Sequence, residues 1–437
     1  MAPSYSLMLD MIRDDQGADG DVPEVVPVDW SHTFPHQPRD DPTGPRIVAS
    51  LVCTSAYPLL AAAMLEHYND VRVVTRHWPA LETYMMMLQR RAGTTALPNF
   101  EVDCGGSSDE SSDGYQSATG AALAAFKYIR ACDAMANLAM ALPDGDGTAA
   151  AVHYHTLANA SRILWHESFW NESLQSYGYI DGEDDAGLVM QSVSAAALTL
   201  GQLPLGRAAM VVRQLHADLQ RRKHHMTVGE VGVRPLLRVL SSSQAGLHDD
   251  AMQLLLQRSF PSYGYWLDNN ATTCWESWSG VADASHPGQP THNHVMLCGG
   301  ADDWLFSTVL GLRPLAPGWA RVQIAPRIAF GGHGPAAANA TVTTMAGMIR
   351  VAWQRSPNSA TLMLQASAAT PATVIIPPCE AAAALTVREG GVLVFAHGVF
   401  VPSPGVAGIF AVTLSATAEV KIECASGEFS FVVGYAA

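Results

Sequence analysis

The sequence predicts two architectures in succession: helical hairpins over residues 1–312, then an all-β sandwich over residues 313–437. In the first part, apolar residues recur at helical spacing, and alanine fills many positions where helices must approach closely. After Leu312 the apolar segments become short, rich in β-branched residues and separated by Gly, Pro, Ser or Asn. A chain of 437 residues is long enough to form two such domains.

The helical part is expected to open with one short apolar helix and a loop rich in Asp, Pro and Gly that extends to about residue 45. Amphipathic helices with short polar turns follow, a pattern typical of helical hairpins packed in a ring or array. Roughly nine helices fit this pattern. The clearest lie at residues 59–65, 74–88, 115–142, 148–167, 186–201, 207–224 and 246–258.

The β part is expected to consist of short strands between turn residues. Its clearest strands lie at residues 321–324, 348–353, 360–364, 373–376, 393–395 and 429–433. Residues 317–326 contain the first of them and are expected to lead the chain into the sandwich.

Composition limits the classes of partner. With 40 acidic and 25 basic residues the formal net charge is -15, which argues against a nucleic acid or an anionic membrane surface. The apolar segments are interrupted well before the ~18 residues that a membrane span needs. The N-terminus lacks a basic segment followed by an apolar one, so we expect a soluble protein without a signal peptide, and a cytoplasmic location is favoured.

The sequence indicates neither a metal nor a cofactor. The seven cysteines show no Cys-x-x-Cys spacing, which argues against a zinc knuckle and against a dense disulfide framework. The histidine pairs have no carboxylate or cysteine at ligand spacing. Phosphate-loop and dinucleotide-binding fingerprints do not occur in the sequence.

One carboxylate, Glu276, lies between Trp275 and Trp278, and Tyr263, Tyr265 and Trp266 come shortly before it. Flat aromatic faces stack on the apolar faces of a pyranose ring, and a partly buried acid can act as general acid or base. This pattern favours a carbohydrate site. The alternative is a solvent-exposed glutamate beside tryptophans that belong to the core.

Further segments carry a resemblance to a known family. Residues 262–278 are followed by an Asn-His pair at 293–294 and by Asp-Trp-Leu at 303–305. Near the start, residues 19–27 read Asp-Gly-Asp-Val-Pro-Glu-Val-Val-Pro. Together these segments resemble the catalytic domain of the inverting α-L-rhamnosidases of glycoside hydrolase family 78. The resemblance implies a six-hairpin (α/α)6 barrel followed by a β-sandwich.

The resemblance also implies an activity and a set of roles. The implied activity is inverting hydrolysis of a terminal α-L-rhamnoside. The expected partner is therefore a carbohydrate or rhamnosylated glycoside, and neither a nucleic acid nor a membrane is expected. Glu276 matches the general base, and His294 matches a histidine that hydrogen-bonds a sugar hydroxyl. Asp19, Trp275 and Trp278 would help to shape the sugar pocket.

The general acid is not identified. In the family it belongs to a motif of the type Asp-Cys-Pro-x-Arg-(Asp/Glu)-Glu, which precedes the loop that begins at Asp19 here. Only 18 residues precede Asp19 and none of them matches, so the barrel is expected to be truncated at its N-terminus. Residues 103–110 begin with Asp-Cys but lack the proline and arginine, and their composition favours a solvated loop.

Two other functions stay open on the sequence. The chain could be a degenerate carbohydrate-binding remnant that keeps the aromatic cleft without the acid. It could also be another helical-barrel glycosidase that acts on a different α-linked sugar.

Overall fold

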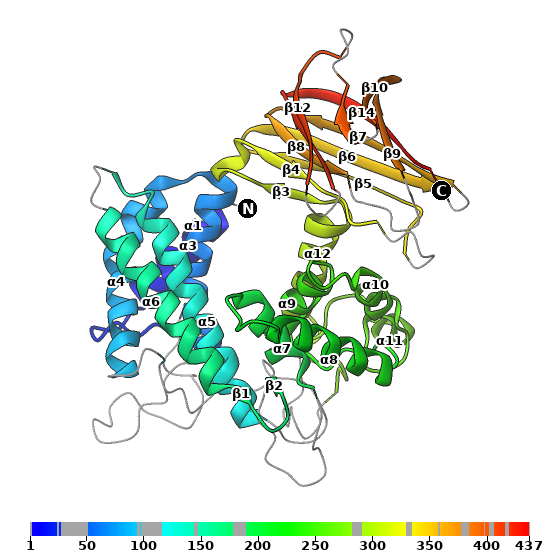
Figure 1. Ribbon diagram of the computed structural model, residues 1–437. Helices are drawn as coiled ribbons and strands as arrows, with labels where there is room; N and C mark the ends of the chain where they lie inside the picture. Colours follow the sequence, from blue (N-terminus) through cyan, green and yellow to red (C-terminus); the bar gives the residue numbers. More distant parts are fainter. Residues whose placement is uncertain are drawn as a thin grey trace. The chain divides into compact units, whose positions relative to one another are not determined.

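The computed structural model describes residues 2–23, 26–27, 51–93, 97, 116–143, 147–177, 189–281, 291–328, 334–356, 359–376, 384–396, 398–401, 406–415 and 419–436. The chain forms two compact units, each assembled from separate stretches of sequence. The first unit comprises Met1–Leu65, Asp70–Leu236 and Asn269–Leu297, and the second comprises Glu66–Asn69, Leu237–Asp268 and Cys298–Ala437. The predicted order of helices followed by strands is confirmed, and β3 begins at Leu312 (Figure 1). The domain boundary at 312/313 stays a prediction.

Helices dominate the first unit. They are α1 (Ala2–Asp14), α2 (Leu51–Thr54), α3 (Ala56–Tyr68), α4 (Val71–Ala92), α5 (Gln116–Ala139), α6 (Gly147–Ser168), α7 (Gln191–Leu200), α8 (Arg207–Arg221) and α9 (Glu230–Leu240). The last residues of α3 and of α9 belong to the second unit. A short hairpin of β1 (Trp170–Asn171) and β2 (Ser176–Tyr177) follows α6. The predicted helices at 59–65, 74–88, 115–142, 148–167, 186–201 and 207–224 all overlap these elements.

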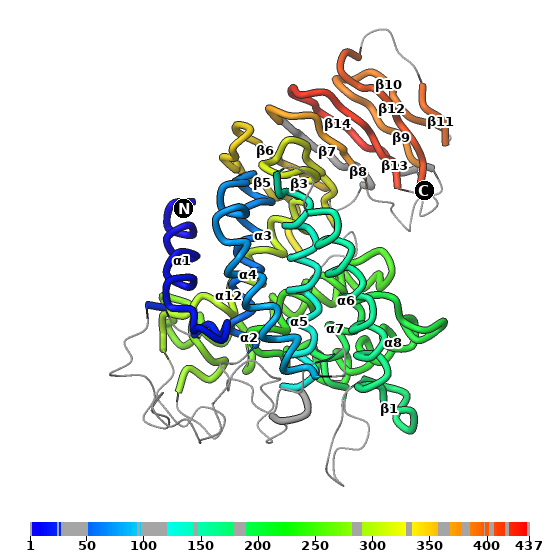
Figure 2. The backbone as a smooth tube through the Cα atoms, turned by 90° about the vertical axis from the view of Figure 1, so that its left-hand side faces the viewer, coloured from blue at the N-terminus to red at the C-terminus, as the bar shows by residue number. Residues whose placement is uncertain are grey.

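The pair α5 and α6 shows how the sequence builds a helical hairpin. Alanines are buried along α5, and their small side chains let α6 approach closely. Trp165 of α6 is fully buried, and its indole Nε1 donates a hydrogen bond of 2.9 Å to the backbone carbonyl of Ala122 in α5. The two helices therefore lie side by side, as Figures 1 and 2 show.

The second unit combines short helical elements with the strands. The helical elements are α10 (His248–Leu256), α11 (Tyr263–Asp268), α12 (Met296–Trp304), the π-helix η2 (Leu305–Val309) and the 3-10 helix η3 (Pro317–Trp319). The strands are β3 (Leu312–Pro314), β4 (Val322–Ile324), β5 (Ala337–Thr344), β6 (Gly347–Ser356), β7 (Ser359–Ala368), β8 (Ala372–Ile376), β9 (Ala384–Glu389), β10 (Val392–Ala396), β11 (Val399–Phe400), β12 (Ile409–Leu414), β13 (Val420–Cys424) and β14 (Gly427–Ala436). All six predicted strands overlap one of these.

The strands form two sheets that pack as a β-sandwich (Figure 1). One sheet has the order β11-β10-β9-β14-β7-β6-β5, and the other has the order β12-β13-β8-β4-β3. Every pairing is antiparallel among the described strands except that of β4 with β8. Buried and more exposed side chains alternate along β6, as expected for a strand with one face on the core. Ile349, Val351 and Trp353 are buried, and the residues between them are more exposed.

Candidate active site

Two loop segments of the first unit pair with each other and build the candidate site. The backbone N–H of Glu276 donates a hydrogen bond of 2.9 Å to the carbonyl of Thr291, and the N–H of His294 donates one of 2.9 Å to the carbonyl of Cys274. The hydroxyl of Thr273 donates to the carbonyl of His292. These bonds fix residues 273–276 beside residues 291–294, so two of the sequence motifs are brought together.

The carboxylate of Glu276 is half-buried and oriented by one residue of the facing segment. Its Oε2 atom accepts a hydrogen bond of 2.7 Å from the backbone N–H of Thr291 and one of 3.0 Å from the hydroxyl of Thr291. Hydrogen bonds to a carboxylate are stronger than those between neutral groups, and they stabilise its negative charge. The loop therefore fixes the orientation of the Glu276 carboxylate and favours its charged form.

Trp275 lies next to Glu276 and is largely covered. Its side chain is 8% exposed and stacks on the ring of His292, with ring centroids 4.8 Å apart and an interplanar angle of 22°. Nε2 of His292 lies 2.6 Å from the carbonyl oxygen of Gly280. The tryptophan, the histidine and the glycine thus form one packed layer beside the carboxylate.

Gly280 closes this layer tightly, and its replacement by alanine is expected to disturb the loop. Its φ angle is +66°, and an added Cβ would lie 2.2 Å from Cε3 of Trp275. We expect Gly280→Ala to lower the free energy of unfolding by about 1–3 kcal/mol, measured by chemical denaturation, because both the backbone and the ring must move.

Gly299→Ala is the matched control for this substitution. Gly299 lies in α12, has no atom within 4 Å of an added Cβ, and is not among the residues with positive φ. Alanine there is expected to leave stability unchanged or to raise it. Equal effects of the two substitutions would contradict the tight packing of Gly280 against Trp275.

Trp278 occupies a different environment from Trp275. It is fully buried, and its Nε1 donates a hydrogen bond of 2.9 Å to the backbone carbonyl of Val228, just before α9. The ring therefore has no exposed face in this structure, and it anchors the loop from inside the first unit. A direct contact of Trp278 with sugar, as the sequence predicts, stays a prediction that its burial does not favour.

His294 and Asp19 complete the set of predicted site residues. His294 is half-buried, and its Nδ1 atom lies 2.9 Å from Oε1 of Glu230, the first residue of α9. Asp19 lies in the turn after α1, where its Oδ1 accepts a hydrogen bond of 3.3 Å from the N–H of Asp21. Arg90 of α4 donates a hydrogen bond of 2.7 Å to the carbonyl of Asp19, which fixes the turn. The role of Asp19 stays a prediction.

Sequence reasoning missed Thr291, Gly280 and Glu230, which hold the predicted residues in place. Nothing in the spacing of the motifs pointed to them. Residues 103–110, considered for the general acid, lie outside the described residues.

Across the described ranges, no group of three or more His, Cys, Asp and Glu side chains is arranged to hold a metal ion. In the same part of the chain, no helix has the length and apolarity to cross a bilayer.

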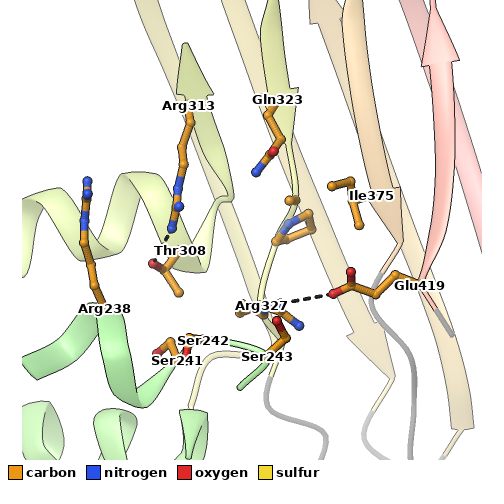
Figure 3. A pocket seen from close by; sticks show the side chains of 12 residues that line it. Arg238, Ser241, Ser242, Ser243, Thr308, Arg313, Gln323, Arg327, Ile375 and Glu419 are labelled. Carbon is orange, nitrogen blue, oxygen red and sulfur yellow. Dashed lines mark hydrogen bonds and ion pairs between the residues drawn. The ribbon is translucent and has the colours of Figure 1, made fainter. Parts of the chain in front are cut away.

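A polar cavity of about 270 Å³ lies within the second unit (Figure 3). Serines 241–243 and three arginines contribute to its lining, and none of the predicted site residues does. Nη2 of Arg327 is 3.0 Å from Oε1 of Glu419, and Nη2 of Arg313 donates to the hydroxyl of Thr308. These contacts tie the wall of the cavity together.

Comparisons with known proteins cover nearly the whole chain. A family model described as bacterial alpha-L-rhamnosidase six-hairpin glycosidase domain matches residues 1–309, and one described as bacterial alpha-L-rhamnosidase C-terminal domain matches residues 311–391. The chain is 28% identical over 214 residues to the alpha-L-rhamnosidase of Streptomyces avermitilis, a match that covers 48% of this chain and 20% of that protein. It is 29% identical over 205 residues to the alpha-L-rhamnosidase of Alteromonas sp., covering 46% and 20%.

Solved structures show the same fold. The alpha-L-rhamnosidase from Dictyoglumus thermophilum has a TM-score of 0.80 at 21% identity, with 99% of this chain and 44% of that chain covered. The Streptomyces avermitilis alpha-L-rhamnosidase complexed with L-rhamnose has a TM-score of 0.70 at 22% identity, with 97% and 36% covered. The chain therefore spans less than half the length of these proteins.

Proposed function

Because the chain belongs to the bacterial alpha-L-rhamnosidase six-hairpin glycosidase family, we propose that it supplies the general-base side of a site for inverting hydrolysis of terminal α-L-rhamnosides. One observation carries the proposal: Glu276, which the sequence resemblance matches to the family's base, has its carboxylate oriented by two hydrogen bonds from Thr291. A neutral glycoside also suits a chain with a net charge of -15, because it meets no electrostatic repulsion.

In this mechanism Glu276 takes a proton from a water molecule while the water oxygen attacks the anomeric carbon. The bond from the anomeric carbon to the glycosidic oxygen breaks on the opposite face, and the departing oxygen needs a proton unless it leaves as a stable anion. Inverting enzymes keep their two carboxyl groups about 6.5–9.5 Å apart to admit the water. The acid on the far side is not assigned to any residue of this chain.

The other residues of the loop have supporting roles in the proposal. His294 hydrogen-bonds a sugar hydroxyl, since a neutral imidazole can donate or accept. Trp275 shapes the pocket from its place next to Glu276 in the chain, and Asp19 contributes from its own turn, which Arg90 holds.

Calorimetric titration with L-rhamnose tests the proposal, and L-fucose, a 6-deoxy-hexose that differs in its hydroxyl configuration, is the matched control. We expect L-rhamnose to bind at one site and L-fucose to bind more weakly. Proton NMR of an aryl α-L-rhamnoside reaction should show the β-anomer of rhamnose as the first product. Binding without turnover would indicate a carbohydrate-binding remnant instead, and neither binding nor turnover would contradict the proposal.

A further inference from the structure

His294 makes a contact that the general-base mechanism does not explain. Its Nδ1 atom lies 2.9 Å from Oε1 of Glu230, and both residues belong to the first unit. Within the described residues, this nitrogen is buried and has no partner of good hydrogen-bond geometry.

The contact determines which ring nitrogen carries the proton. A carboxylate only accepts hydrogen bonds, so a nitrogen at 2.9 Å from it is favourable only when that nitrogen bears hydrogen. A buried polar atom left without a partner costs about 1–3 kcal/mol. Neutral His294 is therefore held with hydrogen on Nδ1, and Nε2 becomes an acceptor.

The geometry leaves Nε2 for a ligand. The side chain of His294 is 33% exposed although Nδ1 is buried, so the exposed surface belongs to other atoms of the side chain. The backbone of His294 is also fixed, because its N–H donates to the carbonyl of Cys274 beside Trp275. With Nδ1 held by Glu230 and the backbone held by Cys274, the ring can offer Nε2 as a single acceptor.

Glu230 lies where a negative charge is favourable. Its side chain is 16% exposed and it is the first residue of α9, where the helix dipole stabilises a negative charge. Burial lowers the pKa of Lys127, and the charge of Glu230 acts on this ammonium in the opposite direction. A carboxylate in this environment can hold an imidazole without large motion.

We propose that Glu230 is a positioning residue that fixes the Nδ1–H form of His294, so that Nε2 accepts a hydrogen bond from a hydroxyl of the bound sugar. The inference rests on the proposed function for the identity of the sugar. No sequence motif assigns a role to Glu230. It begins α9 and lies outside the loop that contains His294.

The test uses the full chain and compares Glu230→Ala with Glu230→Gln. Nitrogen-15 NMR reports the protonation of each ring nitrogen, and the signals of His294 are assigned by their loss in His294→Gln. We expect hydrogen on Nδ1 in the unchanged chain and in Glu230→Gln, because the amide oxygen can still accept. In Glu230→Ala we expect the hydrogen to move largely to Nε2, with affinity for L-rhamnose about tenfold lower, the loss of one hydrogen bond.

Glu167→Ala, on the exposed surface of α6, is the control for removing a carboxylate and should change neither measurement. An unchanged protonation pattern of His294 in Glu230→Ala would overturn the inference, whether or not rhamnose binds. If the unchanged chain binds no L-rhamnose but the proton moves in Glu230→Ala, the positioning role stands and the proposed function fails. The two failures are therefore distinguishable.

Discussion

Glu276→Gln is expected to lower the rate of hydrolysis of an aryl α-L-rhamnoside by about 10²–10⁴-fold, the usual contribution of a general base. Glutamine keeps the size of the side chain, and its amide oxygen can still accept the hydrogen bonds from Thr291. It cannot take a proton from water. The loop should therefore keep its structure, and binding of L-rhamnose by calorimetry should change little while the rate of hydrolysis falls.

The choice of substrate matters, because the general acid is not assigned. A nitrophenyl α-L-rhamnoside is suitable because nitrophenolate is a stable anion and departs without protonation. The rate then depends mainly on activation of the attacking water, which is the step assigned to Glu276. A rhamnoside with an alkyl leaving group would depend on both groups and would separate the two effects poorly.

Two further variants sharpen this prediction. Glu167→Gln removes an exposed carboxylate from α6 and should leave the rate unchanged. In Glu276→Ala, added azide should restore turnover, because the anion attacks the anomeric carbon without giving up a proton and nitrophenolate departs with the bonding electron pair. The product should be the β-configured rhamnosyl azide. Equal rates for the unchanged chain and Glu276→Gln would show that the base assignment is wrong.

Trp278→Ala is expected to lower the free energy of unfolding by about 3–5 kcal/mol, the range for removing a large buried aromatic side chain. The indole is fully buried and donates to the carbonyl of Val228, so alanine leaves both a cavity and a buried acceptor without its donor. Chemical denaturation followed by far-UV circular dichroism measures the loss.

Trp278→Phe is the matched variant, since it keeps most of the buried surface and removes only the N–H. Its expected cost is about 1–2 kcal/mol. The pair also decides between two roles for this tryptophan. A ring that only anchors the loop changes stability first, whereas a ring that stacks on sugar would weaken L-rhamnose binding in Trp278→Phe with little change in stability.

The order of the elements could be predicted from sequence because it depends on local patterns. Period 3.6 apolar repeats in α3 to α8 and short β-branched runs in β4 to β14 are visible within a few residues. The division into units could not be predicted in the same way. It depends on contacts between distant stretches, and residues 237–268 join the second unit although residues 269–297 return to the first.

The candidate site was predicted only in part, for a related physical reason. Trp275 directly precedes Glu276 and Trp278 follows two residues later, but an irregular loop has no periodicity that tells which ring faces the interior. Thr291 and Glu230 were missed because single polar residues far along the chain carry no signal of their own. The same holds for the other tryptophans: Trp165 and Trp304 are fully buried, whereas Trp170 is half-buried with the guanidinium of Arg207 4.0 Å above its ring.

The interleaved order of the two units has a consequence for synthesis on the ribosome. Val228 is synthesised 50 residues before Trp278, whose indole donates a hydrogen bond to its carbonyl. The first unit is complete only at Leu297. The inner faces of the helices already synthesised must therefore avoid non-native contacts while residues 237–268 of the second unit leave the ribosome. Contacts so distant in sequence form slowly, and partly made chains of this kind are the ones that chaperones bind.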